Sequence, residues 1–292
     1  MSRTGRSGGN QGLLLAVLGG VLLLLLFPRK AAARNIKAAV AATATGAEGI
    51  RVAFDAAKRT VFAQLIGPCG KYATDILVVA AQYGIDPFLF AAILRHESGC
   101  GTAKGYRLQG DPAGSGDFIP RTRAAIPKNV PDSVLRAVGS NTNGAAAYLP
   151  ADGLGWGRGI AQVDFAQHYD FVKTGGWKEP RAALNYVADR VLSPAAALFS
   201  KRPPSGGTIN VPATAAAVRR GFAAAGAYAD PRPLKGAAFN KALAVAYNAG
   251  PLNALWAVAA GVDPDKISFS GDYGSKRLAE ASALTATFER TA

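Results

Sequence analysis

The chain has 292 residues, of which 49% are hydrophobic, and a formal net charge of +14. This hydrophobic content excludes a wholly disordered protein and predicts a sizeable buried core. The positive charge suits a polyanionic partner such as nucleic acid, anionic lipid or an acidic cell-wall polymer, and charge alone does not choose among them. Six basic residues precede the first acid of the chain, Glu48: Arg3, Arg6, Arg29, Lys30, Arg34 and Lys37.

The N-terminal region predicts a membrane segment. A basic tail at 1–11 is followed at 12–28 by the apolar run GLLLAVLGGVLLLLLFP. This run is somewhat shorter than the roughly 20 residues of a usual spanning helix, so a cleaved signal peptide is an alternative to a signal anchor. Arg29 and Lys30 stand where a signal peptide prefers neutral residues, and the anchor is therefore favoured. An Ala-rich linker at 29–47 is expected to lead into the folded body.

The body, at 48–292, is predicted to be mainly α-helical. The stretch from 101 to 159 is rich in Gly, Pro, Asn and Asp, with one helical candidate at 131–138. A stretch of this length inside a compact domain predicts a functional loop region over a cleft, whereas the segment 201–212 is typical of a surface connection. Periodicity and capping residues predict helices at about 48–65, 70–83, 87–98, 179–199, 213–226, 236–248, 251–260 and 274–290.

The segment YGIDPFLFAAILRHESGCG carries the first candidate for a catalytic group. Asp86 can cap a helix and Gly99 can end it, which places Glu97 in the last helical turn. Glu97 lies one turn beyond Ile93, on much the same apolar side of the helix. Partial burial and the negative end of the helix dipole both favour the protonated form that a general acid needs. For an isolated helical Glu, the ordinary alternative is a solvated surface side chain.

Two later segments accompany this acid. The segment GLGWGRGIAQVD has four glycines at alternate positions, followed by Gln162 and Asp164. Glycines at this density let the backbone approach a ligand closely. The segment ALAVAYNAGPLNAL ends a helix of small residues with Tyr247 and Asn248. Each segment alone also has an ordinary structural explanation, as turns, a core aromatic residue or a cap.

Taken together and in this order, the segments resemble the lysozyme-like superfamily of goose-type lysozymes and soluble lytic transglycosylases. RHESGCG is similar to the family's acid helix ending in Glu-Ser, GIAQVD to its Gly-x-x-Gln motif, and YNAG matches its third motif in full. DYGSKRLAEA resembles the closing helix of the goose-type branch. The resemblance covers residues from about 70 to 290. It implies a mainly α, lysozyme-like α+β domain with a small β-hairpin region in the cleft.

The resemblance further implies a peptidoglycan-degrading glycosidase that cleaves the β-1,4 bond between MurNAc and GlcNAc. Glu97 would protonate the glycosidic oxygen. The expected partners are the glycan strands and, through the N-terminal segment, a lipid membrane, without a cofactor, a metal or a specific nucleic acid. The domain is expected in the periplasm or cell-wall compartment, or on a virion that delivers it there. The residues expected to bind the sugars or to hold Glu97 are Ser98, Asp152, Gly159, Gln162, Tyr247 and Asn248.

A second carboxylate decides the type of reaction. An inverting hydrolase needs one to activate water, about 6.5–9.5 Å from the acid, whereas a transglycosylase uses the substrate's own hydroxyl group and one Glu. Asp164 is the leading candidate for this base, because the resemblance places Asp there in goose-type lysozymes and commonly Pro in transglycosylases. Asp152 is the second candidate, and Asp164 could instead cap a helix. Hydrolysis is therefore favoured over formation of 1,6-anhydroMurNAc. A non-catalytic peptidoglycan-binding or structural membrane protein is the alternative of another class.

Cys69 and Cys100 are enough for one disulfide if the body works outside the cytoplasm. Such a bridge would tie the segment before the second helix to the end of the Glu97 helix. A zinc site that also uses His96 and His168 is disfavoured, because the spacing matches no compact metal motif. His96 receives no catalytic role, since neighbouring residues of a helix point to different faces.

Overall fold

The structure is a computed structural model, and it describes residues 56–101, 118–140, 144–202, 207–211, 226–268 and 270–292. The basic tail, the expected membrane segment at 12–28 and the linker at 29–47 lie outside these residues. Within the described residues, none of the helices combines the length and apolar character needed to span a bilayer.

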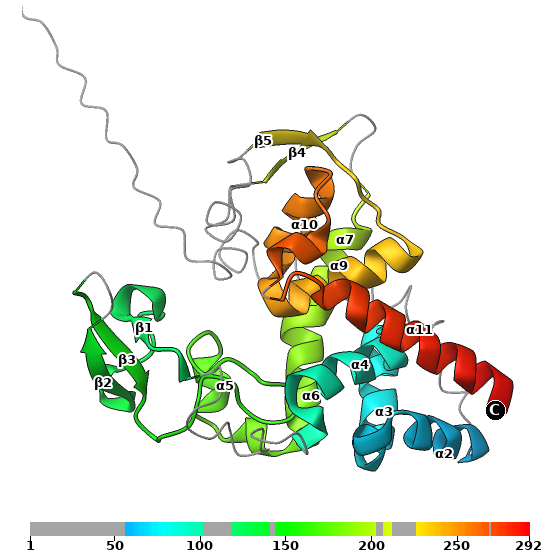
Figure 1. The fold of residues 1–292 in the computed structure, drawn as a ribbon, viewed down its shortest axis with the longest axis horizontal. Coiled ribbons are helices and arrows are strands. Elements are labelled where there is room, and N and C mark those ends of the chain that lie inside the picture. Colours follow the sequence, from blue (N-terminus) through cyan, green and yellow to red (C-terminus); the bar gives the residue numbers. More distant parts are fainter. Residues whose placement is uncertain (1–55, 102–117, 141–143, 203–206, 212–225, 269) are drawn as a thin grey trace, which may run out of the picture.

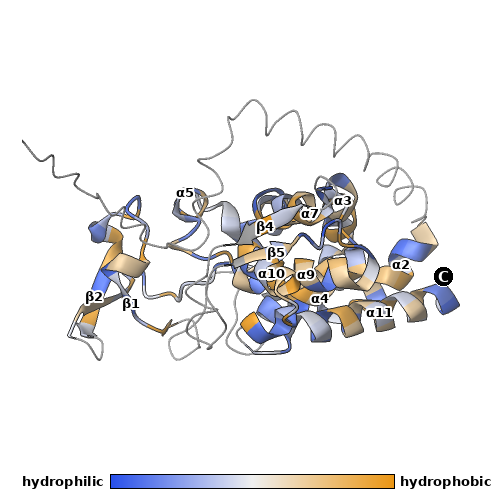
Figure 2. Cartoon of the chain, turned by 90° about the horizontal axis from the view of Figure 1, so that it is seen from above, coloured by the Kyte–Doolittle hydropathy of each residue, from blue (hydrophilic) through white to orange (hydrophobic). Residues whose placement is uncertain are grey.

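The described chain is mainly helical, as expected. The helices gather in one body, and a small sheet stands at one end of the molecule (Figure 1). Figure 2 shows the same separation from above, with hydrophilic residues at the C-terminal end of α11. The helices are α2 (Ala56–Leu65), α3 (Ala73–Tyr83), α4 (Pro87–Ser98), α5 (Tyr169–Val172), α6 (Pro180–Val187), α7 (Ser193–Ser200), α9 (Gly236–Ala249), α10 (Pro251–Ala259) and α11 (Tyr273–Thr291).

The core of the body is built around α4. Every residue from Pro87 to Leu94 is buried, and α4 packs against α3, α9 and α11. The Phe88 ring lies 5.1 Å from the Phe62 ring of α2 and 5.4 Å from the Phe288 ring of α11, measured between ring centroids. Removing the side chain of a large buried residue typically destabilises a protein by about 2–5 kcal/mol. The helix that carries Glu97 is therefore held from several sides.

The sheet contains β1 (Arg121–Thr122), β2 (Leu135–Ser140) and β3 (Ala146–Pro150), which are antiparallel in the order β1-β3-β2. The helix expected at 131–138 is wrong, because β2 begins there after a single 3-10 turn at Asp132–Val134. The periodicity of so short an apolar segment is ambiguous, and its pairing with β3 decides its structure. The long loop region thus contains a small β region of three strands.

A second, two-stranded sheet joins β4 (Thr208–Val211) and β5 (Gly226–Ala229). The segment 201–212, expected to be a plain surface connection, supplies β4. The helix expected at 213–226 lies outside the described residues except for Gly226, which begins a strand instead.

The helix expected at 179–199 is present in three parts. Between α6 and α7, a π-helical turn spans Ala188–Leu192. Pro194 explains this turn, since proline has no N–H group to donate and its ring clashes with the carbonyl group four residues earlier. Widening the helix by one residue per turn relieves that clash while the chain keeps its direction.

Candidate active site

The helix that carries Glu97 has the two caps expected from the sequence. The Asp86 carboxylate accepts hydrogen bonds from the N–H groups of Phe88, at 2.8 Å, and Leu89, at 3.2 Å. At the other end, Gly99 adopts the left-handed conformation with φ of 55°. Buried residues continue up to Leu94, and Glu97 is partly exposed. The carboxylate therefore stands where the buried helix emerges from the core.

Tyr273, at the start of α11, holds the Glu97 carboxylate. Its hydroxyl group donates a hydrogen bond to Oε1 of Glu97 at 2.5 Å. Tyr273 is buried, and the His96 ring meets its ring edge-on with the centroids 4.9 Å apart. His96 thus packs beside the residue that orients the acid. Its contact with Tyr273 is a packing contact.

Ser98 connects the acid helix to the glycine-rich loop. Its hydroxyl group donates to the carbonyl oxygen of Ile160 at 2.7 Å and accepts from the N–H group of Gly101 at 3.2 Å. Ser98 is fully buried. The resemblance predicts that Ser98 binds the substrate, but its hydroxyl group joins two segments of the protein. We therefore assign Ser98 a structural role beside the acid.

The YNAG segment reaches the same loop from α9. The Tyr247 hydroxyl group donates a hydrogen bond to the carbonyl oxygen of Ala161, the residue after Ile160. Asn248, the next residue, is exposed near the end of α9. Three of the predicted segments therefore meet at one place, and Tyr273 adds the fourth.

Two residues of the glycine-rich loop, Gly159 and Gln162, have positive φ angles. Gly159 has φ of 70°, and a side chain there would collide with the carbonyl oxygen of Trp177. Gln162 has φ of 46°, and its side-chain Nε2 donates to the carbonyl oxygen of Gly159 at 3.0 Å. Both residues named for substrate binding thus shape the loop, and the hydrogen bond of Gln162 lies within it.

Backbone strain is concentrated beside Glu97. Among the described residues other than glycine, only Cys100 and Gln162 have positive φ, at 53° and 46°. Such conformations are unfavourable by about 1–3 kcal/mol and persist where the surroundings impose them, often at active sites. Cys100 is also joined to Cys69 by the expected disulfide, with 5.1 Å between the Cα atoms. The chain directly after Glu97 is therefore fixed covalently.

Asp164, the first candidate for the base, is bound by the protein on both oxygens. Its Oδ1 accepts from Arg121 Nη1 at 3.1 Å and from the N–H groups of Ala166 and Gln167, each at 2.9 Å. Its Oδ2 accepts from Arg121 Nη2 at 2.6 Å. The carboxylate therefore caps the following turns, which was the structural alternative for this residue, and joins β1 to the glycine-rich loop.

Asp152, the second candidate, is also paired with an arginine. Its Oδ1 accepts from Arg158 Nη2 at 3.1 Å and from the N–H group of Leu154 at 3.1 Å. The Arg158 side chain is fully buried, and its guanidinium carbon lies 4.9 Å from the centroid of the Phe165 ring. Asp152 therefore pairs with a buried guanidinium group, and this contact ties it to the glycine-rich loop.

Burial raises the pKa of both tyrosines of the site well above the ordinary value, and the negative charge of Glu97 raises them further. For Tyr273, its hydrogen bond to Glu97 adds to the same shift. An anionic carboxylate disfavours ionisation of a nearby hydroxyl group, because the two negative charges repel each other. The Glu97 carboxylate thus accepts the hydrogen bond of Tyr273, and its charge also acts on the Tyr247 hydroxyl group.

This electrostatic coupling leads to a first prediction. Glu97→Gln should lower the pKa of Tyr273 and Tyr247, since a neutral amide removes the repulsion while burial keeps both values above normal. The growth of tyrosinate absorbance with pH measures this change. Glu289→Gln, a change of the same chemistry near the C-terminal end of α11, should leave the curve unchanged. Identical curves for the Glu97 variant and the original protein would mean that Glu97 does not face these hydroxyl groups.

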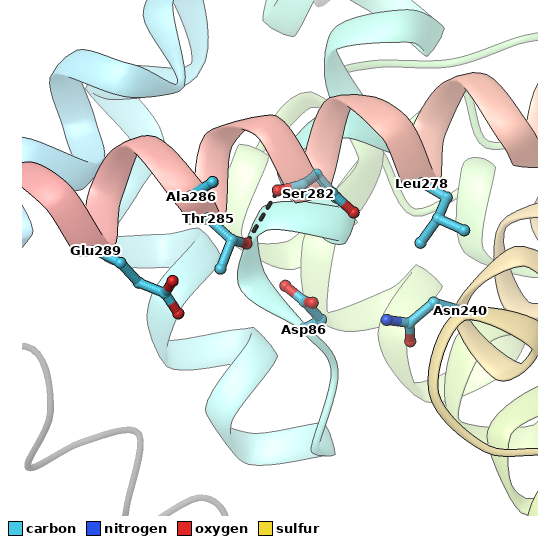
Figure 3. Close-up of a pocket in the computed structure, with 8 residues that line it drawn as sticks. Asp86, Asn240, Leu278, Ser282, Thr285, Ala286 and Glu289 are labelled. Carbon is cyan, nitrogen blue, oxygen red and sulfur yellow. Dashed lines mark hydrogen bonds between the residues drawn. The ribbon is translucent and has the colours of Figure 1, made fainter.

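A groove with a volume of about 290 Å³ lies between α11, α9 and the start of α4, and Figure 3 shows the residues that line it. It lies at the end of α4 opposite to Glu97, and two of its polar residues already make hydrogen bonds within the protein. The Asp86 carboxylate caps α4, and Thr285 Oγ1 donates to the carbonyl oxygen of Ala281 at 2.9 Å. We therefore do not assign the reaction to it. Its lining residues are Asp86, Asn240, Leu278, Ala281, Ser282, Thr285, Ala286 and Glu289.

Comparisons of the chain with protein-family models, curated proteins and solved structures gave no match. Within the described residues, no three His, Cys, Asp or Glu side chains are placed to hold a metal ion.

Tyr273 and Arg121 are not among the site residues predicted from the sequence. The DYG segment predicts only the start of a closing helix. The tyrosine at this helix N-terminus is nevertheless long enough for its hydroxyl group to contact a neighbouring helix. Arg121 lies 43 positions before Asp164 in an irregular stretch, so that no local pattern connects the two.

Proposed function

We propose that the protein cleaves the glycan strands of peptidoglycan at the β-1,4 bond between MurNAc and GlcNAc, with Glu97 as the acid. One observation supports this proposal above all. Four segments distant in the sequence are joined around the end of the Glu97 helix: Tyr273 donates a hydrogen bond to the partly exposed Glu97 carboxylate, while Ser98 and Tyr247 donate to neighbouring carbonyl oxygens of the glycine-rich loop. A general acid requires such fixed orientation toward the bond that it protonates.

The charge and the disulfide support the same proposal. A chain with net charge +14 is attracted to a wall polymer that carries peptide carboxylates. Disulfides persist in oxidising compartments, and the bridge between Cys69 and Cys100 suits a body that works outside the cytoplasm. We infer that the apolar segment at 12–28 delivers the body to the membrane surface that faces the wall.

Within this activity, the geometry favours transglycosylation over hydrolysis. Oδ1 of Asp164 receives three donors, and Oδ2 is held by Arg121, so that a water molecule would have to displace these contacts to reach the carboxylate. Asp152 is engaged with Arg158 and the Leu154 N–H group. The sequence favours hydrolysis, which needs a second carboxylate. We therefore propose transglycosylation instead, a reaction that one carboxylate can perform.

In this mechanism Glu97 acts twice. It first donates its proton to the glycosidic oxygen, so that the bond from C1 of MurNAc to that oxygen breaks. The resulting Glu97 carboxylate then accepts the proton of the MurNAc C6 hydroxyl group while O6 bonds to C1. The products are a free hydroxyl group on GlcNAc and a 1,6-anhydro ring, and Glu97 regains its proton.

A second prediction tests this choice. Mass spectrometry of the digest should show mainly 1,6-anhydro ends, which are lighter than reducing ends by one water molecule. Asp164→Asn should lower thermal stability and activity together, without changing the ratio of the two products. Arg121→Gln should have the same effect, and the double variant should be little worse than either single one, because the two residues form one contact.

Two other results would contradict transglycosylation or the proposed function. Mainly reducing ends, with selective loss of turnover in Asp164→Asn at unchanged thermal stability, would make Asp164 the base of a hydrolase. No cleavage by the original protein of either kind would reject the proposed function.

A further inference from the structure

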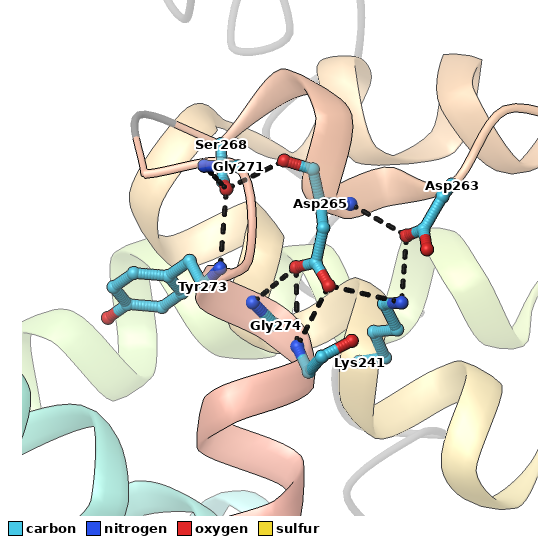
Figure 4. A network of polar contacts seen from close by, with 8 residues as sticks. Lys241, Asp263, Asp265, Ser268, Gly271, Tyr273 and Gly274 are labelled. Atoms are coloured by element: carbon cyan, nitrogen blue, oxygen red, sulfur yellow. Dashed lines mark hydrogen bonds and ion pairs between the residues drawn. The ribbon is translucent and has the colours of Figure 1, made fainter.

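The first turn of α11 is held by a carboxylate from outside the helix. The N-terminal N–H groups of a helix need acceptors, yet Asp272, at the cap position, makes no capping hydrogen bond. Instead, Oδ1 of Asp265 accepts from the N–H groups of Gly274 at 2.5 Å and Ser275 at 3.2 Å, and Oδ2 also accepts from Ser275 at 3.1 Å (Figure 4). A negative charge at this end of a helix is stabilised by the helix dipole.

The Asp265 carboxylate is buried, and a lysine compensates its negative charge. Asp265 is 4% exposed, and Lys241 of α9 approaches its Oδ2 to 3.1 Å. The Lys241 ammonium group also contacts Asp263 at 2.7 Å. Burial alone would lower the pKa of Lys241, but its hydrogen bonds to Asp263 and Asp265 outweigh burial and raise it. The cation between the two carboxylates is therefore supplied by the chain itself.

The backbone of α11 lies directly on this network. A Cβ atom on Gly274 would stand 2.6 Å from Cγ2 of Val245 and 2.9 Å from Oδ1 of Asp265. Only glycine therefore allows the first turn to approach α9 and the carboxylate so closely. Ser268 adds a further link, since its hydroxyl group donates to the Asp265 carbonyl oxygen at 2.8 Å and accepts from the Tyr273 N–H group at 3.4 Å.

The neighbour of Gly274 is Tyr273, whose hydroxyl group holds Glu97. A shift of the first turn of α11 would therefore move that hydroxyl group relative to the carboxylate. Resting on the proposed function, we propose that Asp265 is a positioning residue, which fixes the start of α11 so that Tyr273 orients Glu97 for proton transfer. Asp265 acts through Tyr273 and touches neither the substrate nor the acid.

The test uses Asp265→Asn in the full chain. The amide keeps the size of the side chain but loses the charge and one of the two acceptor oxygens. We expect kcat on soluble glycan fragments to fall about 10- to 100-fold with KM nearly unchanged, because misplacing a reacting group by about 1 Å can have an effect of this size. Asp272→Asn removes a charge from the same helix terminus without touching the α11 N–H groups, and should retain normal kcat.

A double-variant comparison separates positioning from general loss of stability. If Asp265 acts through Tyr273, adding Asp265→Asn to Tyr273→Phe should lower kcat little beyond the effect of Tyr273→Phe alone. Effects that multiply in full would overturn the proposal. Should Asp265→Asn fail to fold, Ser268→Ala removes the weaker link to the Tyr273 N–H group, and the same comparison with Tyr273→Phe applies.

Tyrosine titration tests the contact between the Tyr273 hydroxyl group and Glu97, and it does not require enzymatic activity. Subtracting the curve of the matching Tyr273→Phe variant isolates the Tyr273 hydroxyl group. Its pKa should fall in Asp265→Asn, because the hydroxyl group moves away from the Glu97 charge, and should stay unchanged in Asp272→Asn. An unchanged pKa in Asp265→Asn would overturn the proposal even if the protein cleaves glycans. A lowered pKa in a protein without glycan-cleaving activity would support the positioning and reject the proposed function alone.

Discussion

Glu97→Gln should reduce cleavage of purified peptidoglycan by about 10²- to 10⁴-fold, the range that general acid catalysis contributes. The amide is nearly isosteric with the carboxyl group, and its oxygen can still accept the hydrogen bond of Tyr273. It cannot donate a proton to the glycosidic oxygen. Loss of turbidity and release of soluble glycan fragments measure the activity, while thermal unfolding verifies that the fold is intact.

Glu289→Gln is the matched control for this experiment. Glu289 lies near the C-terminal end of α11 and lines the groove at the opposite end of α4 from Glu97. The control should retain normal turnover. Near-normal turnover of Glu97→Gln on the same substrate would remove Glu97 from the mechanism.

The second large effect is expected on stability. Replacing both Cys69 and Cys100 by Ala should lower the free energy of unfolding by about 3–4 kcal/mol, because the bridge joins residues 31 positions apart and restricts the unfolded chain. For a large domain, this corresponds to a decrease in Tm of roughly 6–16 °C. Denaturant unfolding of the original protein and the double variant measures the difference.

A reducing agent provides the control for this effect. It should bring the unfolding midpoint of the original protein close to that of the double variant, and it should leave the double variant unchanged. Equal midpoints for the two proteins under oxidising conditions would mean that the bridge does not stabilise the folded state.

Much of the helical body could be predicted from the sequence, because its signals are local. Asp86 and Gly99 mark the ends of α4, and both act as caps in the structure. The strand β2 could not be predicted from local sequence. Leu135 and its neighbours are held in a strand by their pairing with β3, which lies further along the chain. The π-helical turn before Pro194 was missed for a different reason: periodicity over 179–199 indicates helix without specifying its hydrogen-bond pattern.

The sequence predicts which segments lie near Glu97 better than it predicts the contacts that each residue makes there. The segments of Ser98, Tyr247 and Gln162 meet beside the helix that carries Glu97, as the motif order predicts, and their roles toward a substrate stay predictions. The individual hydrogen bonds were not foreseeable, because they depend on side-chain directions across segments far apart in the chain. The partner of Asp164 is the clearest example: the carboxylate of this candidate base is bound by an arginine 43 positions earlier in the chain.

Because Tyr273 comes 176 positions after Glu97, the order of protein synthesis controls when the site can form. A ribosome adds about 5–20 residues per second, so Glu97 is made roughly 10–35 seconds before its tyrosine partner. Contacts between such distant residues also form late in folding. A growing chain therefore holds the acid without the group that orients it, and a chain released before residue 273 would lack a completed site.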